Sequence, residues 1–178
     1  MGRCPFRTLA FVLATLSCLT GAPSAMGAEM SGQILAATGA VKLAGEVTRV
    51  PLVASADAAA GLRRKLAEAA GARAIYLVLD DLKAAEAPAV VYEVYLGLPA
   101  GTNPQPDDPH YVDTLNFFAV APPNTQRRAR SYDVTSMVGS VLSRGTADAD
   151  LAVTIVGRNP GGQAAAPPTI GSVALVAQ

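Results

Sequence analysis

Tryptophan is absent from this sequence of 178 residues, and histidine occurs only once, at His110. The two cysteines, Cys4 and Cys18, both lie near the N-terminus. Zinc and copper sites usually take several histidine or cysteine ligands, so residues 29–178 do not hold the side chains for one. Without cysteine this part of the chain also has no disulfide, and its stability must come from packing.

An excess of positive charge is missing as well. The chain has 14 Lys and Arg and 14 Asp and Glu. Residues 1–28 contain Arg3 and Arg7 and no acid, so the remainder has 12 basic and 14 acidic residues and a net charge of −2. Nucleic-acid binding needs a basic excess on one face, whereas Arg127, Arg128 and Arg130 are typical of a solvated loop. We expect no nucleic-acid partner.

The first 28 residues have the pattern of a secretory signal peptide. Arg3 and Arg7 form a short basic region, an apolar run follows from Thr8 to Leu19, and small residues at 25–28 suit cleavage. We therefore predict a signal peptide at 1–28 and a secreted or periplasmic chain that keeps no membrane span.

Two alternatives to signal-peptide removal remain open. The apolar run could be a membrane anchor, but it breaks at Gly21 and Pro23, before the roughly 20 apolar residues that a spanning helix needs. The chain could also be a lipoprotein acylated at Cys18, although Thr15 stands where a lipobox normally carries leucine.

Alternation of apolar residues with period two predicts strands through the rest of the chain. Pro, Gly, Asn and Asp clusters separate them, as in antiparallel sandwiches and barrels. We predict a single mainly β domain over 29–178, an antiparallel β-sandwich or flattened barrel of about seven strands. The strand faces and segments are Val41 to Leu43, Val47 to Leu52, Ile75/Leu77/Leu79, Tyr92/Val94/Leu96/Leu98, Leu115/Phe117/Ala119, Leu151/Val153/Ile155, and Ile170 to Val176.

Two short helices interrupt this pattern. In the first, Ser55 is placed to cap a helix that starts near Ala56 and closes at Gly71. In the second, Asp133 or Thr135 is the expected cap, and Gly145 the expected stop.

Five segments follow one another in a characteristic order: 91–99 (VYEVYLGLP), 109–118 (PHYVDTLNFF), 132–135 (YDVT), 151–156 (LAVTIV) and 170–173 (IGSV). Their order resembles the C-terminal domain of tyrosinases and polyphenol oxidases, including the plant domain named after its Lys-Phe-Asp-Val motif. The resemblance runs from about Val47 to the C-terminus and is strongest over 75–178. Gly97 stands where that family usually has Asn, and Asp113 and Ala119 stand where it usually has Gly.

This resemblance implies a β-sandwich or flattened barrel and a role beside an oxidase. In such oxidases another domain holds two coppers through histidines, and a single His110 cannot supply those ligands. The C-terminal domain shields the copper site and can insert a side chain into its mouth. By analogy, the segment from His110 to Phe118 would contact the oxidase. The alternative for this segment is core packing and loop anchoring, which we favour.

The sequence shows no catalytic constellation of its own. His110 lies near Asp107, Asp108 and Asp113, a loop typical of a solvated histidine rather than of a preorganised metal site. A Ser/His/Asp hydrolase would need a nucleophile on a strained turn, which is not evident. The neighbouring carboxylates Asp80-Asp81 and Asp107-Asp108 suit turns better than acid/base catalysis.

We therefore predict a non-catalytic exported domain without a cofactor that binds, shields or assists a type 3 copper oxidase encoded separately. The predicted contact residues are His110, Tyr111, Phe118 and Tyr95, of which we expect the last three to be exposed aromatics. The alternative is an independent β-sandwich that binds a glycan or envelope component, because fold alone does not fix function.

Overall fold

The structure, a computed structural model, describes residues 32–55, 61–86, 90–118, 128–143, 151–158 and 166–178. Contacts divide the chain into two units, residues 1–30 and 31–178, and all described residues belong to the second. The predicted signal peptide at 1–28, the helix start near Ala56, and Ala119 and Gly145 lie outside the described residues.

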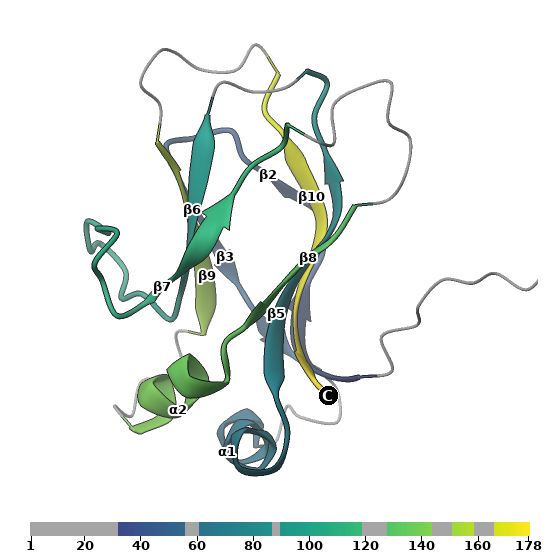
Figure 1. Ribbon diagram of the computed structural model, residues 1–178, viewed down its shortest axis with the longest axis vertical. Helices are drawn as coiled ribbons and strands as arrows, with labels where there is room; N and C mark the ends of the chain where they lie inside the picture. The colour runs from purple at the N-terminus through teal and green to yellow at the C-terminus, as the bar shows by residue number, and fades with distance from the viewer. Residues whose placement is uncertain (1–31, 56–60, 87–89, 119–127, 144–150, 159–165) are drawn as a thin grey trace, which may run out of the picture. The chain divides into compact units, whose positions relative to one another are not determined.

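The first sheet contains six described strands, all paired antiparallel (Figure 1). The strand order is β4-β1-β10-β5-β8, and β2 pairs with the other end of β10. The long strands β5 and β10 run side by side over most of their length, from Ile75 opposite Ala177 to Lys83 opposite Thr169. Its strands are β1 (Gln33–Thr38), β2 (Val41–Lys42), β4 (Val53–Ala54), β5 (Ile75–Lys83), β8 (Arg130–Asp133) and β10 (Thr169–Ala177).

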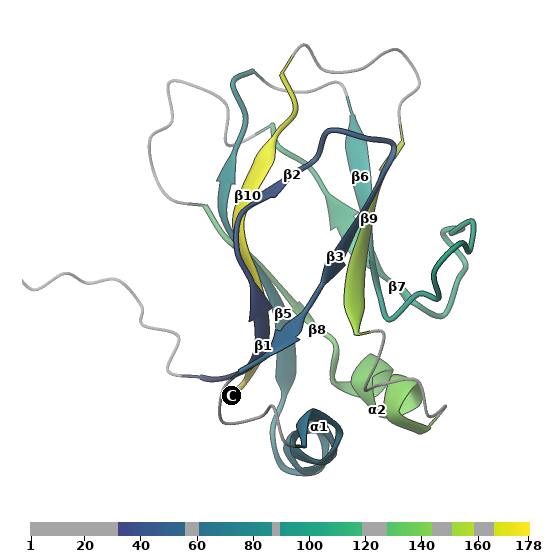
Figure 2. The ribbon, with the colours of Figure 1, turned by 180° about the vertical axis from the view of Figure 1, so that it is seen from behind.

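The second sheet contains four described strands in the antiparallel order β3-β9-β6-β7. It comprises β3 (Val47–Pro51), β6 (Val91–Leu96), β7 (Tyr111–Leu115) and β9 (Ala152–Arg158). The strands β7 and β3 form its edges, and the register places Tyr92 of β6 opposite Leu115 of β7. The two sheets face each other in both views (Figures 1 and 2), so the fold is a β-sandwich.

One hydrophobic core fills the space between the sheets. The period-two faces that the sequence predicts are buried, because inward side chains of both sheets meet there. From the first sheet come Ile75, Leu77 and Leu79, and from the second come Tyr92, Val94, Leu96, Leu115, Val153 and Ile155, all at most 4% exposed.

Two helices, α1 (Leu62–Ala72) and α2 (Thr135–Ser143), lie together at one end of the sandwich (Figure 1). Their buried residues Leu66 and Val138 join the main core, and Arg63 of α1 donates to the Leu142 carbonyl of α2 at 2.6 Å. Among the described residues, neither helix is long and apolar enough to cross a membrane.

The helix caps agree with the sequence prediction at one helix and differ at the other. The Asp133 carboxylate accepts hydrogen bonds from the backbone N–H and the hydroxyl of Thr135 at 2.9 and 2.6 Å, at the start of α2. Ser55 does not cap α1, since Gly61 precedes the helix and the Ser55 amide donates to Leu35. Ser55, the predicted cap, therefore continues the pairing with β1 through its backbone and does not adjoin α1.

The strand prediction missed three described strands, β1, β4 and β8, and displaced one other; β4 has only two residues. β1 lacks clear alternation, because a register shift between Ile34 and Ala36 buries both Leu35 and Ala36. β8 is a short polar edge strand. The strand predicted at Leu115 to Ala119 is found at Tyr111–Leu115, as β7.

Gly97, which follows β6, has a left-handed backbone with φ +68°. A Cβ at this position would lie 3.0 Å from a methyl group of Val141 in α2. Glycine adopts this conformation without strain, and asparagine is among the few other residues that tolerate it. This explains why a position at which the resembling family carries Asn can also be Gly.

Candidate functional site

The residues predicted as a contact site surround β7 and the loop at 97–110 that leads into it. His110 ends this loop, and its ring Nδ1 lies 2.9 Å from the Leu96 carbonyl. Its backbone N–H donates to the Asp108 carboxylate at 2.8 Å, and its carbonyl accepts from the Leu96 N–H at 2.9 Å. His110 is therefore half-buried and bonded to the backbone, as befits a loop anchor.

Tyr95 differs from the prediction, because its side chain is completely buried. It points to the outer face of the second sheet, as the alternation requires, but there it forms a small second core with Leu98 and Val156. Its hydroxyl donates to the Glu93 carboxylate at 2.7 Å. Burial, with the nearby Glu93 charge, raises the pKa of Tyr95 to about 12. The expectation that Tyr95 is exposed was wrong.

The loop that covers Tyr95 is held down by two arginines. Arg158 on β9 forms an ion pair with Glu93 at 2.7 Å and also donates to the Pro104 carbonyl at 2.6 Å. Arg49 on β3 donates to the Leu98 carbonyl. Each guanidinium thus ties a strand of the second sheet to the loop, and hydrogen bonds from charged donors are stronger than neutral ones.

The roles of Arg49, Glu93 and Arg158 were not predicted from the sequence. The available signal was a charged residue inside an otherwise apolar strand, such as Glu93 between Tyr92 and Val94. A charge in that position either faces water or has a partner across the sheet. The partner, Arg158, is 65 residues away in the chain, so the sequence pattern alone does not reveal it.

Tyr111 lies at the start of β7, half-buried over the second core. Its ring makes an edge-to-face contact with that of Tyr95, at a centroid separation of 5.6 Å. Its hydroxyl shares a hydrogen bond of 2.8 Å with the Thr114 hydroxyl. Tyr111 is therefore fixed in place while part of its ring remains accessible.

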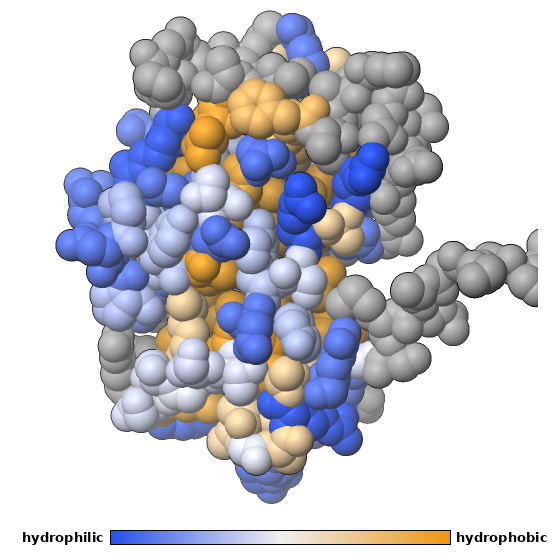
Figure 3. Space-filling model, viewed as in Figure 1, coloured by the Kyte–Doolittle hydropathy of each residue, from blue (hydrophilic) through white to orange (hydrophobic). Residues whose placement is uncertain are grey.

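Phe118 is the most exposed of the predicted contact residues, with 59% of its surface accessible. Its neighbour Phe117 is fully buried, edge-to-face against Tyr92 at 5.5 Å. Val91, which is 38% exposed, begins β6 at the end of the sheet where β7 finishes. Figure 3 shows apolar surface at that end, at the top of the view. We call Val91, Tyr111, Thr114 and Phe118 the β7 surface.

The carboxylate pairs have structural partners. Asp80 accepts from the Asp81 N–H, and Asp81 has φ 53° and forms an ion pair with Lys83 at 2.7 Å. Asp108 accepts from His110. Across the described ranges, no group of three or more His, Cys, Asp or Glu side chains could hold a metal ion.

Residues 29–178 match a family described as a domain of unknown function, DUF7868. No curated protein matches the sequence.

Solved structures similar to this chain include latent apple tyrosinase, at 14% identity and a TM-score of 0.44, covering 83% of this chain and 27% of that one. A recombinantly expressed latent aurone synthase, a polyphenol oxidase, matches at 18% identity and a TM-score of 0.44, covering 79% and 25%. The same enzyme from its natural source matches at 16% identity and a TM-score of 0.42, covering 78% and 25%. The chain thus spans about a quarter of the length of these proteins.

Proposed function

The chain belongs to the DUF7868 family, and we propose that it is an exported, non-catalytic domain that binds and shields a type 3 copper oxidase made as a separate chain. The observation that carries this proposal is the exposed Phe118 on a rigid support. Phe118, with 59% of its surface in water, and Val91, with 38%, leave apolar area that a partner can bury.

The support beneath the β7 surface is well fixed. Phe117, next to Phe118 in the chain, packs in the main core. The Tyr111 ring contacts the Tyr95 ring, and its hydroxyl shares a hydrogen bond with the Thr114 hydroxyl. Binding energy in protein interfaces concentrates in a few aromatic anchors with surrounding polar contacts. Because the surface is already ordered, binding costs little conformational entropy.

The identity of the partner rests on the sequence resemblance from Val47 to the C-terminus. In the resembling oxidases this domain accompanies a copper-binding domain, and the single histidine of the 178 residues cannot supply the copper ligands of such a domain. A separate oxidase chain would complete that arrangement, with Phe118 reaching toward the partner. Export follows from the predicted signal peptide at 1–28.

A non-catalytic role agrees with the chemistry of the described residues. His110 is bonded to the backbone at Leu96, and the carboxylates Asp81 and Asp108 are used in a turn and a loop. In these positions the imidazole and the two carboxylates make structural contacts.

The glycan-binding alternative loses one of its three aromatic residues. A carbohydrate platform needs exposed aromatic rings in a row, and Tyr95 is buried under the loop. Only Tyr111 and Phe118 remain, and the Tyr111 hydroxyl already bonds Thr114. The geometry therefore favours a protein partner.

The test is a direct affinity measurement between the purified chain and the copper oxidase exported by the same cells. We expect saturable binding that lowers oxidase activity, and Phe118→Ala should weaken it about 30-fold, the effect of losing one aromatic hot spot. Val53→Ala is the matched control, because Val53 is 67% exposed on the opposite sheet. Equal affinity of the Phe118→Ala and wild-type chains, or no binding at all, would contradict the proposal.

A further inference from the structure

Asp108 and Pro109 lie in a tight turn at the end of the loop at 97–110. The Tyr111 N–H donates to the Asp108 carbonyl at 2.9 Å, which closes a β-turn with Pro109 at its second position. The Asp108 carboxylate accepts from the His110 N–H at 2.8 Å, so this side chain folds forward over its own peptide bond to Pro109. The turn therefore holds a carboxyl group beside the carbonyl carbon of the Asp108–Pro109 bond.

The Asp108–Pro109 bond is more easily broken than an ordinary peptide bond, and aspartate precedes proline nowhere else in the 178 residues. A carboxyl oxygen that attacks the carbonyl carbon of its own residue closes a cyclic anhydride, and such an intramolecular attack has a high effective concentration. Proline leaves from a tertiary amide as a secondary amine, which is a better leaving group than the nitrogen of an ordinary peptide. Pro109 is exposed, so water can reach both products.

The turn also provides a donor for the charge that develops during this attack. When the carboxyl oxygen adds to the carbonyl carbon, negative charge builds up on the Asp108 carbonyl oxygen, to which the Tyr111 N–H already donates. His110 is itself fixed, because its ring and its carbonyl both bond to the backbone of Leu96. The fold therefore orients the reacting groups, whereas the unfolded chain adopts this arrangement only a small part of the time.

We propose that the chain cleaves its own Asp108–Pro109 bond in mild acid. The neutral carboxyl group of Asp108 forms the new O–C bond, the C–N bond to Pro109 breaks, and the carboxyl proton moves to the proline nitrogen. Water then opens the anhydride, which leaves two carboxyl groups on Asp108 and a free amine on Pro109. Each chain reacts once, so this self-cleavage is independent of the β7 surface and of a non-catalytic role toward other molecules.

Cleavage should accelerate as the pH falls, because the carboxyl group must carry the proton that the proline nitrogen receives. The charged and titratable side chains around the turn belong to the loop and to three strands of the second sheet. They are Asp107 and His110 in the loop, Tyr111 on β7, Glu93 on β6 and Arg158 on β9. Glu93 and Arg158 form an ion pair with each other at 2.7 Å, so the charges closest in the chain to the reacting carboxyl group are those of Asp107 and His110.

The test follows the mass of the purified chain at about pH 5, where ordinary aspartic acids are partly protonated, and at about pH 8. We expect faster cleavage at the lower pH, a fragment that begins with Pro109 and, with hydroxylamine present, a hydroxamate at Asp108, because hydroxylamine traps an anhydride. The same chain unfolded in urea measures the ordinary lability of this bond, and the folded chain should cleave at least about tenfold faster. The fragments should separate only on denaturation, because β5 and β10 pair across the cut.

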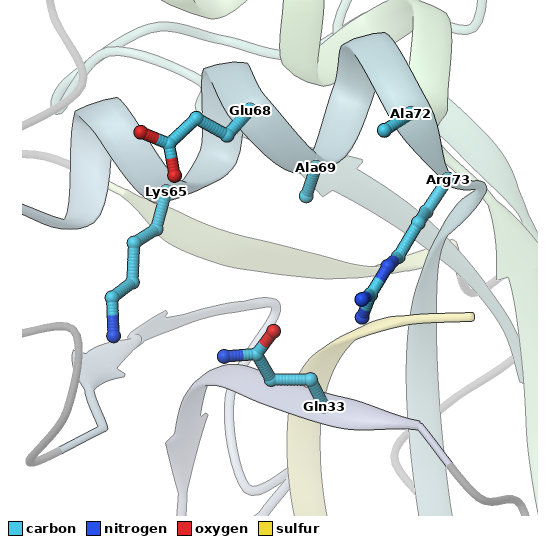
Figure 4. Close-up of a pocket in the computed structure, with 6 residues that line it drawn as sticks. All are labelled: Gln33, Lys65, Glu68, Ala69, Ala72 and Arg73. Atoms are coloured by element: carbon cyan, nitrogen blue, oxygen red, sulfur yellow. The ribbon is translucent and has the colours of Figure 1, made fainter.

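Variants that remain folded by circular dichroism assign the reaction to these groups. Asp108→Ala should abolish cleavage, and Pro109→Ala should slow it at least about tenfold. Pro106→Ala, at an exposed proline of the same loop, is the matched control, and Glu68→Gln removes a carboxylate that lines a groove between α1 and β1 (Figure 4). Both controls should cleave like the wild-type chain. Equal rates in the folded and unfolded chains, cleavage without a hydroxamate, or a chain that stays intact at about pH 5 would overturn the proposal.

Discussion

Phe117 and Phe118 are neighbours in the chain but lie in opposite environments: the first is fully buried against Tyr92, and the second leaves 59% of its surface exposed. We expect Phe117→Ala to lower the free energy of unfolding by about 3–5 kcal/mol through a core cavity. Phe118→Ala should change it by less than about 0.5 kcal/mol. Urea unfolding of both variants measures the difference, and a large loss for Phe118→Ala would show that its ring serves stability.

Removing the Arg158 side chain should loosen the loop at 97–110. Arg158→Ala deletes the bonds to Glu93 and the Pro104 carbonyl, and we expect a loss of about 1 kcal/mol, because solvent screens the partly exposed guanidinium. Hydrogen exchange should speed up at the amides of Asp108 and Tyr111, which bond within the loop. Arg130→Ala is the control. Equal exchange rates in both variants would show that Arg158 does not hold the loop in place.

Gly97→Ala should destabilise the chain by about 1–2 kcal/mol, because alanine is strained at φ +68° and its methyl would crowd Val141. Gly39 has open space around its Cβ position and no positive φ, so Gly39→Ala should not destabilise the chain. Thermal unfolding of the two variants compares them. Equal melting temperatures would mean that the backbone after β6 shifts enough to accommodate the added methyl group without strain.

Thr135 connects the start of α2 to β5. Its hydroxyl accepts from the Ile75 N–H at 2.8 Å while donating to Asp133 at 2.6 Å. Thr135→Val leaves the fully buried Ile75 without this acceptor, and we expect a loss of about 1–3 kcal/mol in urea unfolding. Ser136→Ala, at the exposed next position, should be nearly neutral. A neutral Thr135→Val would mean that another acceptor replaces the hydroxyl.

Stability should fall at strongly alkaline pH. Burial raises the pKa of both Tyr95 and Tyr132 to about 12 from the ordinary value of 10. Between these values the unfolded chain has lost phenol protons that the folded chain retains, so the free energy of unfolding decreases as pH rises from about 10 to 12.

An ultraviolet titration of the phenolate band, combined with urea unfolding across this pH range, checks this dependence. Tyr95→Phe should flatten part of it. An unchanged profile in that variant would show that Tyr95 is not protected in the folded chain.

Much of the sandwich is predictable because inward side chains alternate along β5, β6 and β9. Exposure on the outer face is not predictable in the same way. Tyr95 does point outward, yet a loop held by Arg49 and Arg158 buries it. Val156 of β9 is buried in the same second core, together with Leu98 of the loop. The alternation of apolar residues indicates which face of the sheet a side chain occupies. Contacts with residues far away in the chain determine whether that face is covered.

The surroundings of the predicted contact residues were predictable only where they depend on local sequence. Phe118 was recognised as exposed because it adjoins the inward Phe117, a local relation. His110 anchors the loop through the Leu96 carbonyl, 14 residues away, and no local pattern specifies that bond. The β1 and β8 strands were missed because an irregular register and a polar edge hide their period.

The most direct test of the central claim is an affinity pull-down of the tagged chain from the exported proteins of its own cells, with mass spectrometry and a copper assay. Wild-type and Phe118→Ala chains serve as paired baits. Our account predicts that the wild-type chain retains a histidine-rich copper oxidase and that the Phe118→Ala chain does not. Recovery of only envelope polymers, recovery of nothing, or equal retention by both baits would contradict it.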